Sequence, residues 1–215
     1  MAVDPHLAQF LNEQRSRVRA PHRAVFEDVV ADLGAWFRKR RRGAAAAGAA
    51  DLRGLVAAWY LRHEGLVTIH DARHFMAAVR VFARWHTAGW SPGRARRLRA
   101  FVAGATRDTL RAARAGALLD RESIAPRHGT GPDGFWQVTL RGAAHVVLRD
   151  VRSGACVGPV GLPPGVVRTL PVGAVLNLRL GRDAGTWSIL EHGACYPALV
   201  AAELRAEPAG VGSDE

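Results

Sequence analysis

The sequence has only two cysteines, Cys156 and Cys195, among its 215 residues. This is too few for a disulfide framework or a structural zinc site built from thiolates, so we expect two free, buried thiols. Long hydrophobic runs are also missing, because no stretch approaches the roughly 20 apolar residues that span a bilayer. The first ten residues lack the basic segment and apolar core of a secretory signal. We therefore expect a soluble, cytoplasmic protein without a membrane partner.

Lysine is almost absent, whereas arginine is abundant. The chain has 30 Lys plus Arg against 19 Asp plus Glu, a formal net charge of +11, and Lys39 is its one lysine. Residues 1–122 hold 22 of the cations and 11 of the acids, and the remainder holds 8 of each. This excess in the first part favours an anionic partner such as nucleic acid. The codon usage of a GC-rich genome would explain the same arginine bias without such a partner, so both interpretations stay open.

The first 122 residues show helical periodicity. We expect helices over residues 4–18, 21–42, 51–65, 68–89 and 91–122, with a small-residue linker at 43–50 and a kink or split at Gly104. Asp4-Pro5 and Ser91-Pro92 each place a capping residue before a proline suited to the first helical turn. Thr68 and Asp71 stand three apart, as in a reciprocal cap. An offset of 49 residues aligns the apolar stripes of the first two helical units, which suggests two stacked helical hairpins followed by a further helix.

The pattern changes after residue 122. Residues 123–134 read as a Gly/Pro linker, and period-two alternation then predicts strands over 135–140, 144–151, 156–160, 174–180 and 186–191. The fold class expected is α+β, with an N-terminal all-helical domain followed by a small antiparallel β barrel or curled sheet. The expected divisions are a basic helical domain at 1–122, the linker, a β domain at 135–205 and a disordered tail at 206–215.

Two motifs suggest chemistry, and both have a structural explanation. His70 and His74 have the spacing of His-Glu-x-x-His zinc sites, but Asp71 replaces the glutamate and no third ligand is placed by spacing. The segment 129–134 satisfies G-x-G-x-x-G, yet a helix precedes it and a strand follows, the reverse of a dinucleotide site. No nucleophile elbow, P-loop lysine or suitably spaced carboxylate pair occurs in the sequence. We therefore expect no metal, no cofactor and no enzyme activity.

The helical half resembles a known family at one turn. The stretch YLRHEGLVTIH at 60–70, followed by the apolar stripe of Phe75, Val79, Phe82 and Trp85, resembles the core-binding, SAM-like helical domain of tyrosine recombinases, the phage-integrase family. In that family this domain clamps one side of the DNA, and a separate domain carries the catalytic Arg, His and Tyr. Here the second half lacks the Arg…His-x-x-Arg…Tyr arrangement around Tyr196. The resemblance implies a DNA-contacting module without recombinase activity.

The whole chain also resembles a group of uncharacterised bacterial proteins with a similar helical first half, which implies a shared architecture and no activity. We expect a non-catalytic protein that binds DNA, with RNA as the alternative, through the phosphate backbone. The β half would serve for homodimerisation or partner docking, and its Arg168, Arg179 and Trp136 are candidates to assist. The rival is a protein-interaction or assembly adaptor with a basic, solubilising surface. The residues expected to bind nucleic acid are Arg38, Lys39, Arg40, Arg41, Arg42, Arg94, Arg96, Arg97, Arg99, Arg107, Arg111 and Arg114.

Overall fold

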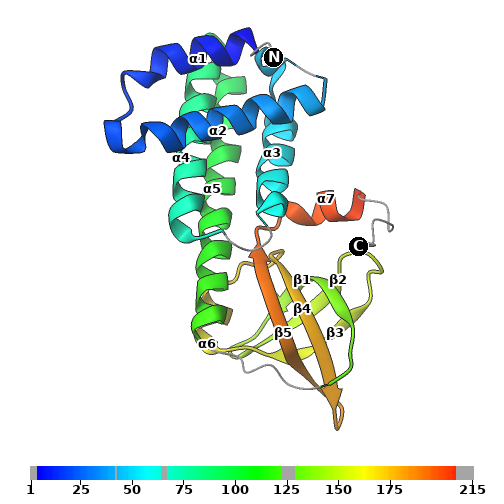
Figure 1. Ribbon diagram of the computed structural model, residues 1–215. Helices are drawn as coiled ribbons and strands as arrows, with labels where there is room; N and C mark the ends of the chain where they lie inside the picture. Colours follow the sequence, from blue (N-terminus) through cyan, green and yellow to red (C-terminus); the bar gives the residue numbers. More distant parts are fainter. Residues whose placement is uncertain (1–3, 42, 64–66, 123–128, 207–215) are drawn as a thin grey trace, which may run out of the picture.

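The computed structural model describes residues 4–41, 43–63, 67–122 and 129–206. The α+β class is confirmed, because a helical part comes first and a closed ring of five strands follows it (Figure 1). Arg42, the expected helix end at Gly65, the first half of the expected linker (residues 123–128) and the tail from residue 207 onward lie outside the described residues. No helix in the described ranges is long and apolar enough to cross a membrane.

The helices of the first part begin largely where the sequence predicts. The Asp4 carboxylate accepts hydrogen bonds from the backbone amides of His6 and Leu7 at 3.0 and 3.2 Å. Thr68 and Asp71 each accept the other's backbone amide at 3.1 Å, so the predicted reciprocal cap is confirmed. Such caps each stabilise a helix by about 1 kcal/mol. The elements are α1 (Pro5–Arg15), α2 (Ala20–Lys39), the 3-10 turn η1 (Ala44–Ala46), α3 (Ala49–Arg62), α4 (Ile69–His86) and α5 (Pro92–Arg121).

Two local expectations in this part need correction. The cap of α3 is Gly48 rather than Asp51, whose carboxylate instead accepts the Gly48 amide at 3.0 Å from within the first turn. The expected split at Gly104 is absent, because α5 continues through it as a single helix of 30 residues. Packing along the length of α5 outweighs the cost of about 1 kcal/mol for a glycine in a helix interior.

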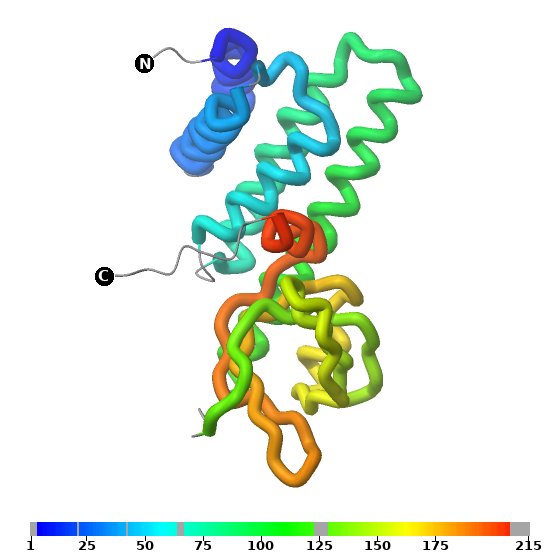
Figure 2. The backbone as a smooth tube through the Cα atoms, turned by 90° about the vertical axis from the view of Figure 1, so that its right-hand side faces the viewer, coloured from blue at the N-terminus to red at the C-terminus, as the bar shows by residue number. Residues whose placement is uncertain are grey.

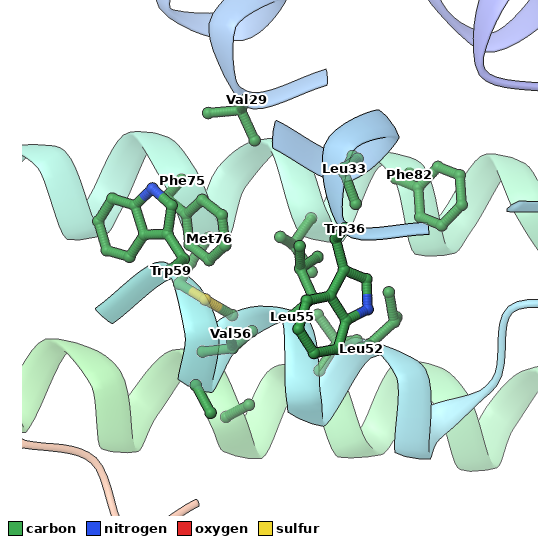
Figure 3. Close-up of a cluster of buried hydrophobic side chains, with 14 of the residues drawn as sticks. Val29, Leu33, Trp36, Leu52, Leu55, Val56, Trp59, Phe75, Met76 and Phe82 are labelled. Atoms are coloured by element: carbon green, nitrogen blue, oxygen red, sulfur yellow. The ribbon is translucent and has the colours of Figure 1, made fainter. Parts of the chain in front are cut away.

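The helical core lies where α2, α3 and α4 meet (Figure 3). Trp36 of α2 and Trp59 of α3 are each 6% exposed, and the Trp59 ring stacks on Phe75 of α4 with ring centroids 4.1 Å apart. Aromatic rings bury large apolar areas, so these contacts hold the three helices together. Figure 2 shows α1 and α2 on one side of the helical part, α5 on the opposite side, and α3 and α4 between them. In agreement, α4 packs against both α2 and α5.

All five predicted strands are present. They close a ring in the order β1-β2-β3-β5-β4, and four of the neighbouring pairs are antiparallel. The fifth pair, β3 with β5, is parallel and has Val160 opposite Trp187, so the sheet is mixed rather than purely antiparallel. Because β4 returns to lie beside β1, the strands follow a Greek-key order. The strands are β1 (Asp133–Arg141), β2 (His145–Asp150), β3 (Cys156–Gly161), β4 (Val175–Asp183) and β5 (Thr186–Tyr196).

Two short helices were not predicted. The helix α6 (Pro164–Thr169) connects β3 to β4, and α7 (Val200–Ala206) follows the last strand and returns to pack on α3. Figure 1 shows α7 between the helical part and the ring. Its Val200, Ala201 and Leu204 are buried in the helical core. The strands of the expected β domain at 135–205 therefore end at Tyr196, and the residues of α7 join the other core.

The helical part and the ring share α5. Its Leu98 and Val102 belong to the helical core, whereas Ala112, Ala115 and Leu119 near its other end are buried against the ring. A 30-residue helix is about 45 Å long, long enough to reach both cores. The boundary expected near residue 122 thus separates helix from strand along the chain, but the last turns of the helix pack as part of the ring.

Candidate nucleic-acid interface

The predicted cationic run at the end of α2 divides into residues with different surroundings. Arg38, Lys39 and Arg41 are exposed to solvent. Arg40 is also exposed, but it lies over the indole of Trp36, 4.6 Å from the ring centroid, and one of its guanidinium nitrogens is 3.4 Å from a carboxylate oxygen of Glu203 on α7. Arg40 therefore holds α7 against the helical part. Its charge has a structural explanation that needs no ligand.

The predicted arginines of α5 are also divided by the structure. The Arg94 guanidinium lies 3.8 Å from the ring centroid of Trp90, a cation–π contact that ties it to the preceding turn. Arg97 is two residues from Arg99, and positions two apart do not share a helix face. Arg96, Arg99, Arg107 and Arg114 are separated by three, eight and seven residues, which brings them to one side of the helix. Arg111 lies beside the last two on the exposed surface.

Three arginines line a groove between α4 and α5. Arg80 and Arg84 come from α4 and Arg99 from α5, and the groove has a volume of about 210 Å³. Small apolar side chains form its floor, namely Ala83, Val102 and Ala103. All three arginines are exposed, and none of them forms an ion pair with any residue that the structure describes. We call this feature the arginine groove.

No acidic residue of α4 or α5 neutralises the arginine groove. Asp71 is engaged in the cap at the far end of α4. Asp108 is nine residues from Arg99, or two and a half helical turns, and so lies on the opposite side of α5. Asp120 is near the ring, 3.8 Å from His192. Arg99 donates one hydrogen bond, from Nε to the Ala95 carbonyl oxygen at 3.3 Å. With no ion-pair partner among the described residues, the three guanidinium groups give this surface a positive charge above an apolar floor.

The α4 half of this surface was not predicted from the sequence. Arg73, Arg80 and Arg84 are seven and four residues apart and share one side of α4. That spacing could have predicted a cationic side of this helix. It was missed because apolar residues separate these arginines, which therefore do not form a run. The antiparallel packing of α4 on α5 then places them beside Arg99.

The two predicted cationic segments do not come together. The end of α2 and the arginines of α5 belong to opposite sides of the α3–α4 layer (Figure 2). The two segments therefore do not line a single groove. The convergence that exists is between α4 and α5.

The histidine motif at 70–74 forms an aromatic cluster. The rings of His70 and His74 have centroids 4.0 Å apart, and His22 of α2 contacts His74 at 5.3 Å. Partial burial, followed by the neighbouring histidine charges, lowers the pKa of His74. Among the residues that the structure describes, no group of three or more His, Cys, Asp or Glu side chains is placed to hold a metal ion. The cluster thus joins α2 to α4.

The glycine motif at 129–134 is explained by close packing against the ring. A Cβ atom at Gly131 would collide with the backbone carbonyl of Leu180, and one at Gly129 would lie 3.3 Å from the Leu190 side chain. The Pro132 carbonyl accepts a hydrogen bond from the Leu180 amide at 2.9 Å. Glycine is required at position 131 because backbone meets backbone there, as in other sites of close approach.

Three further expectations about the second half have definite outcomes. Trp136 is a core residue, 3% exposed, whose indole donates a hydrogen bond to the Leu178 carbonyl at 3.0 Å, so it cannot assist at the surface. Arg179 pairs with Glu191, whereas Arg168 is exposed on α6. The prediction of two buried thiols is wrong for Cys156, which starts β3 on its outer face, and holds for Cys195.

Searches against protein-family models, curated proteins and solved structures find no match for the chain. The resemblance of the helical half to recombinase core-binding domains therefore stays a prediction.

Proposed function

We propose that this protein is a non-catalytic DNA-binding protein that contacts the phosphate backbone through the arginine groove. The observation that carries the proposal is the convergence of Arg80, Arg84 and Arg99 from two helices, with no carboxylate partner among the described residues. Arginine offers planar, forked donors that match phosphate oxygens. An exposed cluster without a carboxylate partner among the described residues supports such contacts.

The flanking arginines extend this surface along α5. From Arg99 to Arg114 the helix rises by about 22 Å, at 1.5 Å per residue. Successive phosphates on one strand of a duplex are about 3.4 Å apart along the axis, so the row spans about six of them. The side chains face outward from regular helices, and such contacts supply affinity with little sequence information. The dimerisation or docking role expected of the ring stays a separate prediction.

The test is the salt dependence of binding, measured by fluorescence anisotropy on a labelled duplex of about 20 base pairs, roughly three times the length of the arginine row. The first variant combines Arg80→Gln, Arg84→Gln and Arg99→Gln. The matched control combines Arg38→Gln, Lys39→Gln and Arg41→Gln, which removes the same charge from the end of α2. Arg40 is kept in the control because it anchors α7 through Glu203.

We expect the wild type to bind with a steep negative slope of log affinity against log salt. Loss of three phosphate contacts should reduce that slope by about 2.7, and the control should keep the slope near the wild-type value. Equal losses in both variants would mean that net charge, and not the groove, determines binding. No binding by the wild type at about 50 mM salt would overturn the proposal and leave the adaptor interpretation.

A further inference from the structure

A cavity of about 640 Å³ lies where the helical part meets the ring, and it shares no residue with the arginine groove. Its walls are the end of α3, the start of α4 with the residues before it, the last turns of α5 and the end of β5. Figure 1 shows these segments meeting between the two parts of the molecule. Small-molecule sites have volumes of about 300–1,000 Å³ and often lie at such junctions. We call this feature the junction cavity.

Small residues keep the junction cavity open. On α5 it is lined by Ala113, Gly116 and Ala117, and on β5 by Gly193 and Ala194. The pairing of β4 with β5 shifts at this point, so that one residue of β4 faces two residues of β5. Such a bulge bends the strand, and bulges are over-represented next to active sites. None of these side chains is long enough to fill the space between the helix and the strand.

The floor of the junction cavity is apolar. Tyr60, Ala113 and Cys195 are 2%, 5% and 6% exposed, and the half-buried Ile69 adds a further apolar wall. The Tyr60 hydroxyl donates a hydrogen bond to the Thr109 carbonyl at 3.1 Å, so this polar group needs no ligand. A buried thiol behaves as a small apolar group. The floor therefore favours the hydrocarbon or aromatic part of a ligand.

The mouth of the junction cavity carries a carboxylate. The exposed Asp120 lines it, and the ion-pair partner of this side chain among the described residues is His192, whose Nδ1 is 3.8 Å away, longer than a hydrogen bond. The Thr68 hydroxyl is already bonded to the Asp71 carboxylate at 2.6 Å, and the His70 ring belongs to the histidine cluster described above. No lysine or arginine lines the cavity among the residues that the structure describes. In a chain with a net charge of +11, the mouth of this cavity is thus locally negative.

We propose that the junction cavity binds a small organic cation, whose apolar body lies on the floor and whose positive group lies beside the Asp120 carboxylate. A phosphate or carboxylate ligand would instead bring a negative charge beside Asp120, with no lysine or arginine among the described lining residues to compensate it. Exposed arginines more than about 8 Å away have little influence, because salt at about 0.15 M screens their charge.

The experiment measures binding to the full chain by isothermal titration calorimetry with three probes that share a naphthalene ring. Naphthylmethylamine is cationic, naphthylmethanol is neutral and naphthoate is anionic. Asp120→Asn removes the carboxylate, and its control, Asp108→Asn, removes the same charge from a position of α5 that does not line the cavity. Ala117→Trp fills the mouth, and its control, Ala100→Trp, places the same side chain at another exposed position of α5. Circular dichroism checks that each variant is folded.

We expect naphthylmethylamine to bind the wild type about 1.5- to 5-fold more tightly than naphthylmethanol, the range for an exposed ion pair, and naphthoate to bind more weakly than either. Asp120→Asn should abolish the preference for the amine and keep the affinity for naphthylmethanol, whereas Asp108→Asn should keep the preference. Ala117→Trp should remove the binding of all three probes, and Ala100→Trp should bind them as the wild type does. The inference would be overturned if naphthylmethylamine did not bind the wild type or if Asp120→Asn kept the preference for the amine. Equal binding by Ala117→Trp and Ala100→Trp would overturn it as well.

Discussion

Replacing Gly54 and Gly104 by alanine should change stability in opposite directions, although both are glycines in helix interiors. Alanine is favoured over glycine in such positions by about 1 kcal/mol. At Gly104 no atom lies within 4 Å of the added Cβ, so Gly104→Ala should stabilise the protein by about 1 kcal/mol. At Gly54 the added Cβ would lie 2.6 Å from Cζ2 and 3.0 Å from Cη2 of Trp36. Real side chains do not approach so closely, so the indole or α3 must move.

The surroundings of the indole leave little room for that movement. Trp36 is only 6% exposed, and Arg40 lies over its ring. Overpacking of this kind costs about 1–3 kcal/mol, which leaves a net loss of between zero and about 2 kcal/mol for Gly54→Ala. Urea unfolding followed by circular dichroism measures both variants, and Trp36→Phe in the Gly54→Ala background should recover part of the loss. Equal stabilisation by Gly54→Ala and Gly104→Ala would refute the tight contact between α2 and α3.

Two other predictions concern buried titratable groups. Nε2 of His6 lies 2.9 Å from Nδ1 of His86, and Nε2 of His86 lies 3.0 Å from the carbonyl oxygen of Ala47. Burial lowers the pKa of both histidines, so the unfolded chain binds protons more readily and stability falls as pH drops below 6.5. The midpoint of urea unfolding should decrease from about pH 7.5 to about pH 5, and this decrease should be smaller in His86→Gln. A variant with the same pH dependence as the wild type would contradict the prediction. Burial also raises the pKa of the Cys195 thiol to about 12, whereas Cys156 is exposed. A thiol reagent at neutral pH should therefore react with one thiol in the native protein and with two in urea. Rapid reaction of both thiols without urea would refute the burial of Cys195.

Local signals were enough to predict most of the elements. The helix start at Asp4 and the cap formed by Thr68 and Asp71 depend on hydrogen bonds within one turn, so the residues that make them are close in sequence. The alternation of Leu176, Leu178 and Leu180 predicted β4 because successive strand residues face opposite sides. The short helices α6 and α7 were missed, since neither is long enough to show a periodic pattern.

The α+β order, most of the helix starts and the excess of arginine before residue 122 could be predicted from the sequence, because each of these depends on composition or on neighbours along the chain. The tertiary structure alone decided which arginines share a surface. Arg40 contacts Trp36 and Glu203. Arg99 lines one groove with Arg80 and Arg84 because α4 packs antiparallel to α5. The net charge of a segment is the sum over its residues and can be counted from the sequence. A binding surface depends instead on the distances between side chains. Those distances are set by how the helices pack.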